Sequence, residues 1–183
     1  ESALPTGKKD ALRLEPAEFR YRMMKRCGIS HVYAPDFCDI KDFSGEEFFE
    51  KILIGHLKCG KVVCGTDFRF GKMASCGVKE LKELCGSRGI ECVVVDKLLD
   101  NGKEISSTRI RKAIEKGDTK DFIRLCGYPF CIEKEVVEGK HLGREYSLPT
   151  INQAFDKGYI IPRFGVYVSA AYIDGKFYPA VTN

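Results

Sequence analysis

The spacing of apolar residues predicts helices along the first 127 residues. The first is amphipathic and covers residues 16–27, where the apolar positions recur at helical spacing: Phe19, Met23, Met24 and Cys27. A second helix is indicated after Ser44, because Ser44 and Glu47 form a capping-box pattern ahead of an apolar run. Val78, Leu81 and Leu84 mark a third helix. Residues 106–115 form a fourth helix that ends at Gly117, and Asp118 caps a short fifth helix.

Short apolar runs between these helices predict strands. The runs cover residues 29–37, 61–64 and 90–95, and the last is an apolar run of the kind that a buried parallel strand shows. Strands that alternate with helices of this length imply right-handed βαβ units around a parallel sheet. The first part of the chain is therefore expected to be an α/β domain.

The pattern changes after Gly127. Residues 130–137 resemble a strand, and alternating runs at 165–173 and 176–181 flank Asp174-Gly175, a dipeptide typical of a two-residue hairpin. The second part is expected to be all-β, so we predict one domain over residues 1–127 and another over residues 128–183. A small barrel would need closing strands beyond Asn183, and Glu1 stands in place of an initiator Met. We expect the chain to be a piece of a longer protein.

Composition places the chain among ordinary globular proteins. Its 183 residues are 44% hydrophobic and 31% charged, and its 30 basic and 26 acidic residues are intermixed, which favours a mildly basic solvated surface over a nucleic-acid-binding face. No run approaches the roughly 20 apolar residues that span a bilayer, and no secretory leader pattern is present. We therefore expect a cytoplasmic protein with no nucleic-acid or membrane partner. The sequence gives no indication of its oligomeric state.

The cysteines and histidines indicate neither disulfides nor a metal site. Nine cysteines occur without a Cys-x-x-Cys pattern, which favours reduced thiols that pack as small hydrophobic groups. The three histidines are not at metal-ligand spacing.

A hydroxyl-rich helix start is the first candidate site. The run is Ile105-Ser106-Ser107-Thr108-Arg109-Ile110-Arg111. Hydroxyls at a helix start cap free backbone amides, and those amides together with the helix dipole attract an anion such as a triphosphate. The guanidinium of Arg111, one turn further, could contact the same phosphates. A surface helix with a good cap and solvated arginines is the alternative, and the run by itself leaves it open.

A glycine-containing loop is the second candidate site. The run Gly65-Thr66-Asp67-Phe68-Arg69-Phe70-Gly71-Lys72 directly follows the strand predicted at residues 61–64. Ligands of open α/β sheets bind beyond the carboxyl ends of the strands, so this loop is in the favoured place. Its glycines would permit close approach of the backbone, Asp67 could accept hydrogen bonds, and the two phenylalanines could line a ring pocket or pack inward. A purely structural turn remains the alternative.

Both runs resemble motifs of bacterial FAD synthetases. Residues 65–71 resemble their Gly-x-Asp-Phe-Arg-Phe-Gly segment, and residues 105–111 resemble their Ile-Ser-Ser-Thr-x-x-Arg motif. The resemblance implies a Rossmann-like domain of the nucleotidyltransferase superfamily that moves AMP from ATP onto FMN and releases pyrophosphate. It further implies that ATP phosphates are held by Ser106, Ser107, Thr108 and Arg111. The implied nucleotide and flavin loop contains Gly65, Asp67, Phe68, Phe70 and Gly71.

Residues 139–152 resemble the Gly-rich flap and Pro-Thr-Ala-Asn motif of flavokinases, although Ile151 replaces the usual Ala. The resemblance implies a partial flavokinase barrel that phosphorylates riboflavin with ATP, and Mg²⁺ held by Thr150 and Asn152. The implied kinase nucleotide site contains Gly139, Gly143, Arg144, Pro149, Thr150 and Asn152. From the residues alone, a turn in which Thr150 and Asn152 bond their own backbone is equally open.

Two catalytic elements of bacterial bifunctional riboflavin kinase/FAD synthetases have no counterpart in the sequence. These are the His-x-Gly-His motif and the glutamate base of the kinase. We therefore assign no catalytic residue and expect the 183 residues to perform neither reaction efficiently, while the parent protein makes FMN and FAD from riboflavin and ATP. The alternatives are another small-molecule adenylyl- or cytidylyltransferase and a non-catalytic remnant that binds a nucleotide or RNA.

Overall fold

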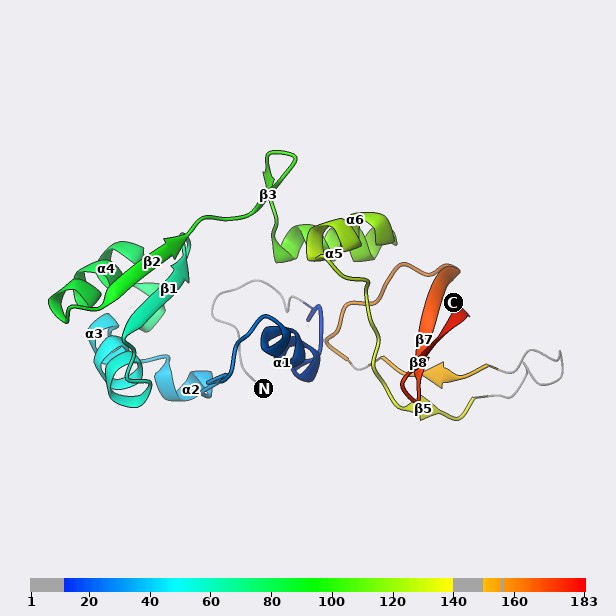
Figure 1. Cartoon of the computed structure of the whole chain (residues 1–183), viewed down its shortest axis with the longest axis horizontal. Helices are drawn as coiled ribbons and strands as arrows, with labels where there is room; N and C mark the ends of the chain where they lie inside the picture. The colour runs from blue at the N-terminus through cyan, green and yellow to red at the C-terminus, as the bar shows by residue number, and fades with distance from the viewer. Residues whose placement is uncertain (1–11, 140–149, 156) are drawn as a thin grey trace. The chain divides into compact units, whose positions relative to one another are not determined.

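The computed structural model describes residues 12–139, 150–155 and 157–183 (Figure 1). Contacts divide them into two compact units. The first contains Arg20–Glu104, and the second contains residues 12–19 together with Ile105–Asn183. A contact unit is not the same as a domain, so the boundary between residues 127 and 128 stays a prediction.

The elements alternate as the sequence predicts for a mixed α/β chain. Up to Glu104 they are α1 (Ala17–Arg26), α2 (Phe37–Ile40), α3 (Gly45–Glu47), the π-helix η1 (Phe48–His56), β1 (Lys61–Gly65), the 3₁₀-helix η2 (Lys72–Ala74), α4 (Val78–Ser87), β2 (Glu91–Val95), β3 (Leu99–Asp100) and β4 (Lys103–Glu104). After Glu104 they are α5 (Ser107–Lys116), α6 (Thr119–Cys126), β5 (Val136–Val137), β6 (Asn152–Gln153), β7 (Tyr167–Ile173) and β8 (Lys176–Thr182).

A parallel pair of strands is the centre of the first unit. β1 and β2 run parallel with Val62 opposite Cys92 and Gly65 opposite Val95, and α4 connects them, which confirms the predicted βαβ unit. The fully buried residues Phe49, Leu81 and Cys85 come from η1 and α4 and form the core that covers this pair. Figure 1 shows α4 lying along the two strands.

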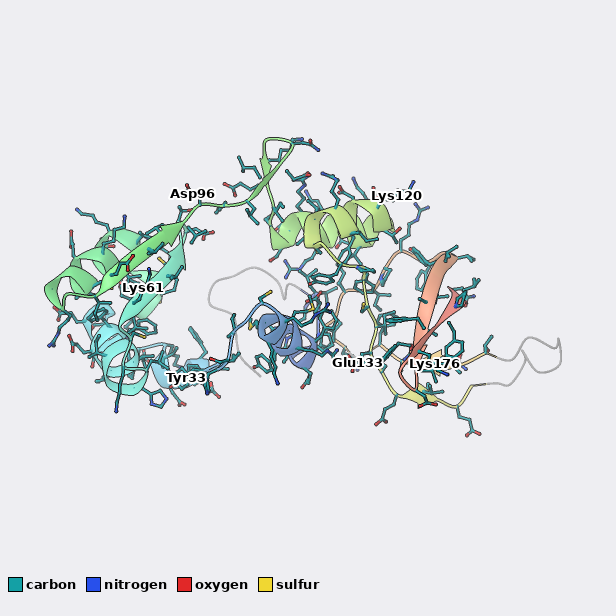
Figure 2. All side chains as sticks on the ribbon, viewed as in Figure 1. Tyr33, Lys61, Asp96, Lys120, Glu133 and Lys176 are labelled. Carbon is teal, nitrogen blue, oxygen red and sulfur yellow. The ribbon has the colours of Figure 1, made fainter. Side chains whose placement is uncertain are left out.

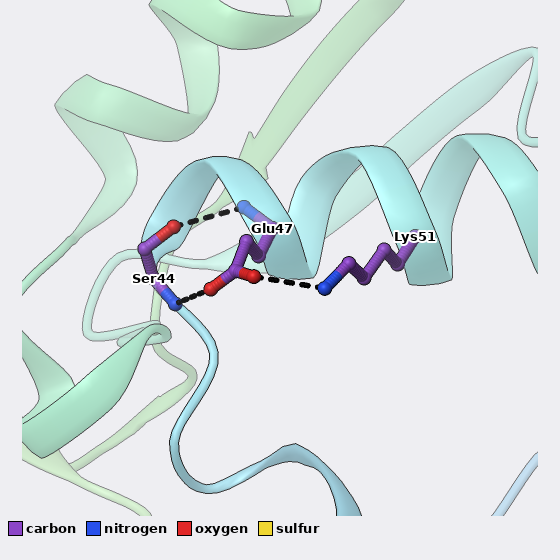
Figure 3. A network of polar contacts seen from close by, with 3 residues as sticks. All are labelled: Ser44, Glu47 and Lys51. Atoms are coloured by element: carbon purple, nitrogen blue, oxygen red, sulfur yellow. Dashed lines mark hydrogen bonds and ion pairs between the residues drawn. The ribbon is translucent and has the colours of Figure 1, made fainter.

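The capping box that the sequence predicts is present at Ser44 (Figure 3). The Ser44 hydroxyl accepts a hydrogen bond from the Glu47 backbone N–H (3.1 Å), and the Glu47 carboxylate accepts one from the Ser44 backbone N–H (3.0 Å). Lys51 adds an ion pair to the same carboxylate at 2.8 Å. Its hydrogen bond is the largest cause that lowers the pKa of Glu47 below the ordinary value of 4.5. These contacts fix the start of the helix that buries Phe49.

The strand predicted at residues 29–37 does not form. Residues 29–36 have no regular secondary structure, and α2 begins at Phe37 because the Asp36 carboxylate accepts the Cys38 backbone N–H at 2.8 Å. No strand in the described part of the chain pairs with this segment. Apolar residues alone do not make a strand, since its backbone groups need a neighbouring strand to bond.

The second unit contains two packed helices, α5 and α6. Their buried residues Ala113, Ile114 and Phe122 form a cluster with Ile160. Gly117 ends α5 in the left-handed conformation (φ 71°), and the Asp118 carboxylate caps α6 by accepting the Asp121 backbone N–H at 2.9 Å. The predicted helices in this region are therefore confirmed.

The β part of the second unit agrees with the prediction only in places. The predicted hairpin is confirmed, since β7 and β8 pair antiparallel and Asp174 and Gly175 both have positive φ angles (49° and 82°), as a type I′ turn requires. The strand predicted at residues 130–137 is reduced to β5, which pairs with the equally short β6, and Phe130 packs edge-on against Phe122 of α6 with ring centroids 5.6 Å apart.

The sheets of the described residues are all two-stranded. β1–β2 is parallel, β3–β4, β5–β6 and β7–β8 are antiparallel, and none closes into a barrel within the described ranges. This arrangement confirms the predicted class, an α/β part with a small parallel sheet followed by a partial all-β part.

Candidate nucleotide-binding site

The loop after β1 leaves the sheet at its carboxyl edge, beside the segment that follows β2. Gly65 and Val95 are paired neighbours, and Asp67 and Lys97 each follow two residues later. The Lys97 ammonium lies 3.3 Å from the Asp67 carboxylate. Asp96, labelled in Figure 2, marks where the chain leaves β2. Parallel strands thus bring a carboxylate and an ammonium to the edge where such sheets bind ligands.

Backbone contacts hold the far end of this loop. Phe70 and Cys76 exchange two backbone hydrogen bonds of 3.0 and 3.1 Å, and the Lys72 N–H donates to the Phe43 carbonyl at 2.6 Å. Gly71 has φ 75°, and a β-carbon there would lie 3.0 Å from the Gly45 nitrogen. The close backbone approach that Gly71 permits is therefore made with Gly45 of the protein itself.

The two phenylalanines of the loop differ in burial. Phe70 is only 6% exposed and belongs to the core of the first unit, so it packs inward. Phe68 is half-buried and stacks on Phe70, with ring centroids 5.6 Å apart and an interplanar angle of 19°. Of the two roles that the sequence allows, ring binding or inward packing, the structure gives Phe70 the second.

The predicted phosphate-binding helix start lies in the second unit. Ser106 is the N-cap of α5, and its hydroxyl accepts the Arg109 backbone N–H at 3.3 Å. Ser106, Ser107 and Thr108 are exposed. Arg111 is half-buried, and its Nε donates to the Leu12 carbonyl at 2.9 Å. The structure therefore gathers the three hydroxyls on one exposed helix start and fixes Arg111 one turn further.

Two of the predicted kinase residues lie together. Val137 of β5 is opposite Asn152 of β6, and a β-carbon on Gly139 would overlap the Asn152 side-chain amide. Only glycine therefore fits at position 139 with Asn152 in this place. Thr150 is exposed. Gly143, Arg144 and Pro149 lie outside the described residues.

Lys97 and Glu104 are site neighbours that the sequence motifs do not include. The Lys97 ammonium lies 2.9 Å from the Glu104 carboxylate as well as 3.3 Å from that of Asp67. The pKa of Lys97 is raised, first by the hydrogen bond to Glu104 and then by Asp67. One signal could have found Lys97 in the sequence, namely its position two residues after the second parallel strand, where Asp67 stands after the first.

All nine cysteines are free thiols, as the sequence predicts. Cys64, Cys85 and Cys92 line the core of the first unit, and burial raises the pKa of Cys85 from 9.0 to about 11. Within the described ranges, no three His, Cys, Asp or Glu side chains are grouped so that they could hold a metal ion. The helices of those ranges include none long and apolar enough to cross a membrane.

A known family model covers the first part of the chain. The family model for FAD synthetase matches residues 2–109, more than half of the chain. The chain belongs to the FAD synthetase family. A second model, for riboflavin kinase, matches residues 126–183 of this FAD synthetase family member.

Curated relatives carry both activities in their names. The bifunctional riboflavin kinase/FMN adenylyltransferase of Bacillus subtilis (strain 168) is 32% identical over 93% of this FAD synthetase family member and 54% of the relative. Those of Listeria monocytogenes and Escherichia coli (strain K12) are 30% and 28% identical over 92% and 96% of the chain, and 54% and 56% of the relatives. The chain spans about half the length of these relatives.

A solved structure shares the fold of the matched part. It is described as a macrolide-efflux protein from Streptococcus pneumoniae, and it superimposes with a TM-score of 0.81 at 32% identity, covering 92% of this chain and 54% of that one.

Proposed function

We propose that this chain is part of a bifunctional enzyme of FAD biosynthesis. The enzyme phosphorylates riboflavin with ATP to give FMN, and it transfers AMP from a second ATP to FMN to give FAD. The observation that supports this proposal most directly is that FAD synthetase and riboflavin kinase models match consecutive parts of one chain. The kinase match weighs against an unrelated adenylyl- or cytidylyltransferase and against a remnant that binds RNA.

For adenylyl transfer, we propose that the start of α5 holds the ATP phosphates. Ser106, Ser107 and Thr108 are exposed at a helix N-terminus, where backbone N–H groups and the helix dipole favour an anion. Arg111 supplies a fixed positive charge one turn further, and its Nε contact with Leu12 limits the positions of its guanidinium. In the loop of residues 65–71, Gly65, Asp67 and Phe68 are the proposed contacts for nucleotide and flavin, whereas Phe70 and Gly71 anchor the loop on the core.

For phosphorylation, we propose that the nucleotide lies against Gly139 and Asn152, with Gly143, Arg144, Pro149 and Thr150 completing the site. The bare backbone of Gly139 beside the Asn152 amide supports this assignment. Thr150 and Asn152 offer oxygen atoms, the ligands that Mg²⁺ prefers when it also binds substrate phosphates and water. Bound Mg²⁺ would neutralise phosphate charge during transfer.

Domain limits and location complete the proposal. We place the adenylyltransferase part in residues 1–127 and the kinase part in residues 128–183. A cytoplasmic location is supported by the nine free thiols, because reducing compartments keep cysteines unpaired. The ligands proposed are small molecules, and neither nucleic acid nor membrane is among them.

The test uses the full-length protein that carries this chain. Incubated with riboflavin, ATP and Mg²⁺, it is expected to produce FMN and then FAD, separated by chromatography. Arg111→Ala should slow FAD formation strongly and spare FMN formation, because Arg111 belongs only to the first site. Lys112→Ala, an exposed neighbour on the same helix, is the matched control. Equal loss of both activities in Arg111→Ala would contradict the two-site assignment.

The 183 residues alone give a second test. They lack the His-x-Gly-His motif, so mixing them with FMN and ATP is expected to give no FAD. FAD formation by the isolated chain would show that adenylyl transfer does not need those histidines.

A further inference from the structure

Three charged groups meet at the carboxyl edge of the β1–β2 pair. Lys97 lies between two carboxylates, with its Nζ 3.3 Å from Asp67 Oδ2 and 2.9 Å from Glu104 Oε2. We call Asp67, Lys97 and Glu104 the charged trio. Asp67 belongs to the proposed nucleotide and flavin loop, whereas Lys97 and Glu104 belong to none of the recognised motifs.

The local fold accounts for how the trio forms. The parallel register of Gly65 with Val95 places Asp67 and Lys97 two residues beyond the same pair. The β3–β4 hairpin then returns the chain, because Leu99 is paired with Glu104. Its turn residues Asn101 and Gly102 both have positive φ angles, as in a tight type I′ turn. Glu104 is thereby brought back to Lys97.

We propose that Lys97 is a positioning residue for adenylyl transfer, which holds the Asp67 carboxylate in one orientation by tying it to Glu104 of β4. The inference rests on the proposed function. A carboxylate on an exposed loop otherwise samples several rotamers, and a ligand that binds it must select one of them. The contacts of Lys97 with Asp67 and Glu104 hold the Asp67 side chain in one rotamer before the ligand binds.

The net charge of the charged trio indicates which chemical groups of a ligand Asp67 binds. One ammonium and two carboxylates carry one net negative charge, so the trio repels phosphate and attracts hydrogen-bond donors. Asp67 uses Oδ2 for Lys97, and its Oδ1 lies on the Gly65 side of the loop. The Asp67 side chain is 72% exposed and thus open to a ligand. The ligand group that the Asp67 carboxylate binds is a hydrogen-bond donor such as a ribose or ribityl hydroxyl, an amino group or a ring N–H.

Exposure separates this role from a contribution to stability. The side chains of Lys97 and Glu104 are 36% and 56% exposed, and exposed ion pairs contribute little to folding. The same strand pair carries a matched control at its opposite end, where Lys61 pairs with Glu91 at 2.9 Å and the side chains are 52% and 63% exposed. Removing either ammonium should therefore change stability similarly, whereas only Lys97 should change ligand binding.

The experiment compares Lys97→Met, Lys97→Arg and Lys61→Met in the full-length protein. FMN binding is followed by flavin fluorescence, ATP binding by calorimetry, and FAD formation by steady-state kinetics. Loss of one pre-ordered side chain should raise the Kd and KM of FMN or ATP on the order of three- to tenfold, with kcat nearly unchanged. Lys97→Arg should restore much of the loss, and Lys61→Met should match the wild type.

A double-mutant cycle with Asp67→Asn distinguishes positioning from direct contact. If Lys97 acts through Asp67, then Lys97→Met should have little further effect once Asp67 is changed. An undiminished effect of Lys97→Met in the Asp67→Asn protein would show that Lys97 touches the ligand itself and would overturn the inference. Unchanged Kd and KM in Lys97→Met, or an equal loss in Lys61→Met, would also overturn it.

The role of Lys97 and the proposed function are tested by different outcomes. An active wild-type protein in which Lys97→Met has no effect overturns the role of Lys97 alone. A wild-type protein that forms no FAD from FMN and ATP overturns the proposed function and the role of Lys97 with it.

Discussion

The backbones of Gly71 and Gly45 lie directly against each other. A β-carbon on Gly71 would fall 3.0 Å from the Gly45 nitrogen and 3.2 Å from its α-carbon, and the φ of Gly71 is 75°. The end of the Asp67 loop is thereby fixed on the first turn of the helix that Ser44 caps. Two glycines 26 positions apart thus make one close contact that neither run of sequence reveals.

Gly45→Ala is expected to destabilise the first unit. Its new methyl group would overlap the Cys76 sulfur and crowd Phe70 of the core, and such overpacking costs about 1–3 kcal/mol. The measurement is the change in free energy of unfolding in urea. Gly86→Ala is the control, because a β-carbon there meets nothing within 4 Å and alanine favours the helix by about 1 kcal/mol. Equal stability of the two variants would contradict the packing described at Gly45.

The capping box predicts a pH dependence at Glu47. Hydrogen bonds from Lys51 and from the Ser44 backbone lower the pKa of Glu47 below 4.5 in the folded state. The contribution of ionised Glu47 to folding stability is therefore present above the unfolded pKa, near 4.5. It is lost as the pH falls through the lower pKa of the folded state. Carboxyl NMR titration should give a pKa below 4.5 in the wild type and a higher one in Lys51→Met. An unchanged pKa in Lys51→Met would count against the ion pair seen in Figure 3.

Cys85 is expected to resist alkylation. Burial is the main cause that raises its pKa to about 11, so at pH 8 the thiolate that attacks iodoacetamide is scarce and shielded. Cys38 is exposed and should react before Cys85. Mass spectrometry of the labelled peptides measures both rates, and urea should make them equal. Rapid labelling of Cys85 in the folded protein would contradict its place in the core.

Gly139→Ala should affect the kinase reaction selectively. Its methyl group would displace the Asn152 amide, and we expect FMN formation to fall at least tenfold while FAD formation from added FMN continues. Gly165→Ala is the control, since a β-carbon there comes no closer than 3.8 Å to another atom. Full kinase activity of the Gly139→Ala variant would show that Asn152 does not belong to the proposed kinase site.

Some features follow from neighbouring residues alone, and the sequence predicts them. The Ser44 capping box, the Asp118 cap, the Asp174-Gly175 turn and the helix α4 all occur as predicted. Each depends on contacts within a few residues or on a short apolar period. Local conformational preference and hydrogen bonding suffice to determine such features.

Other features depended on partners distant in the chain. The segment at residues 29–37 is apolar enough for a strand, but none of the described strands lies beside it to bond its backbone. Phe130 packs against Phe122 and leaves the strand predicted for it, and Phe70 turns into the core rather than toward a ligand. A pattern of apolar residues shows that they will be buried but does not show against what.

The features of the candidate site also fall into two groups, those that continuous runs of sequence predict and those that only the fold brings together. The sequence by itself determined the family motifs and the hydroxyl-rich start of α5, because these are continuous runs. Only the tertiary structure decided that Lys97 joins Asp67 and Glu104 and that Gly139 lies against Asn152. These contacts require strand register and chain reversal, which arise when segments pair across the fold, so no single segment contains them.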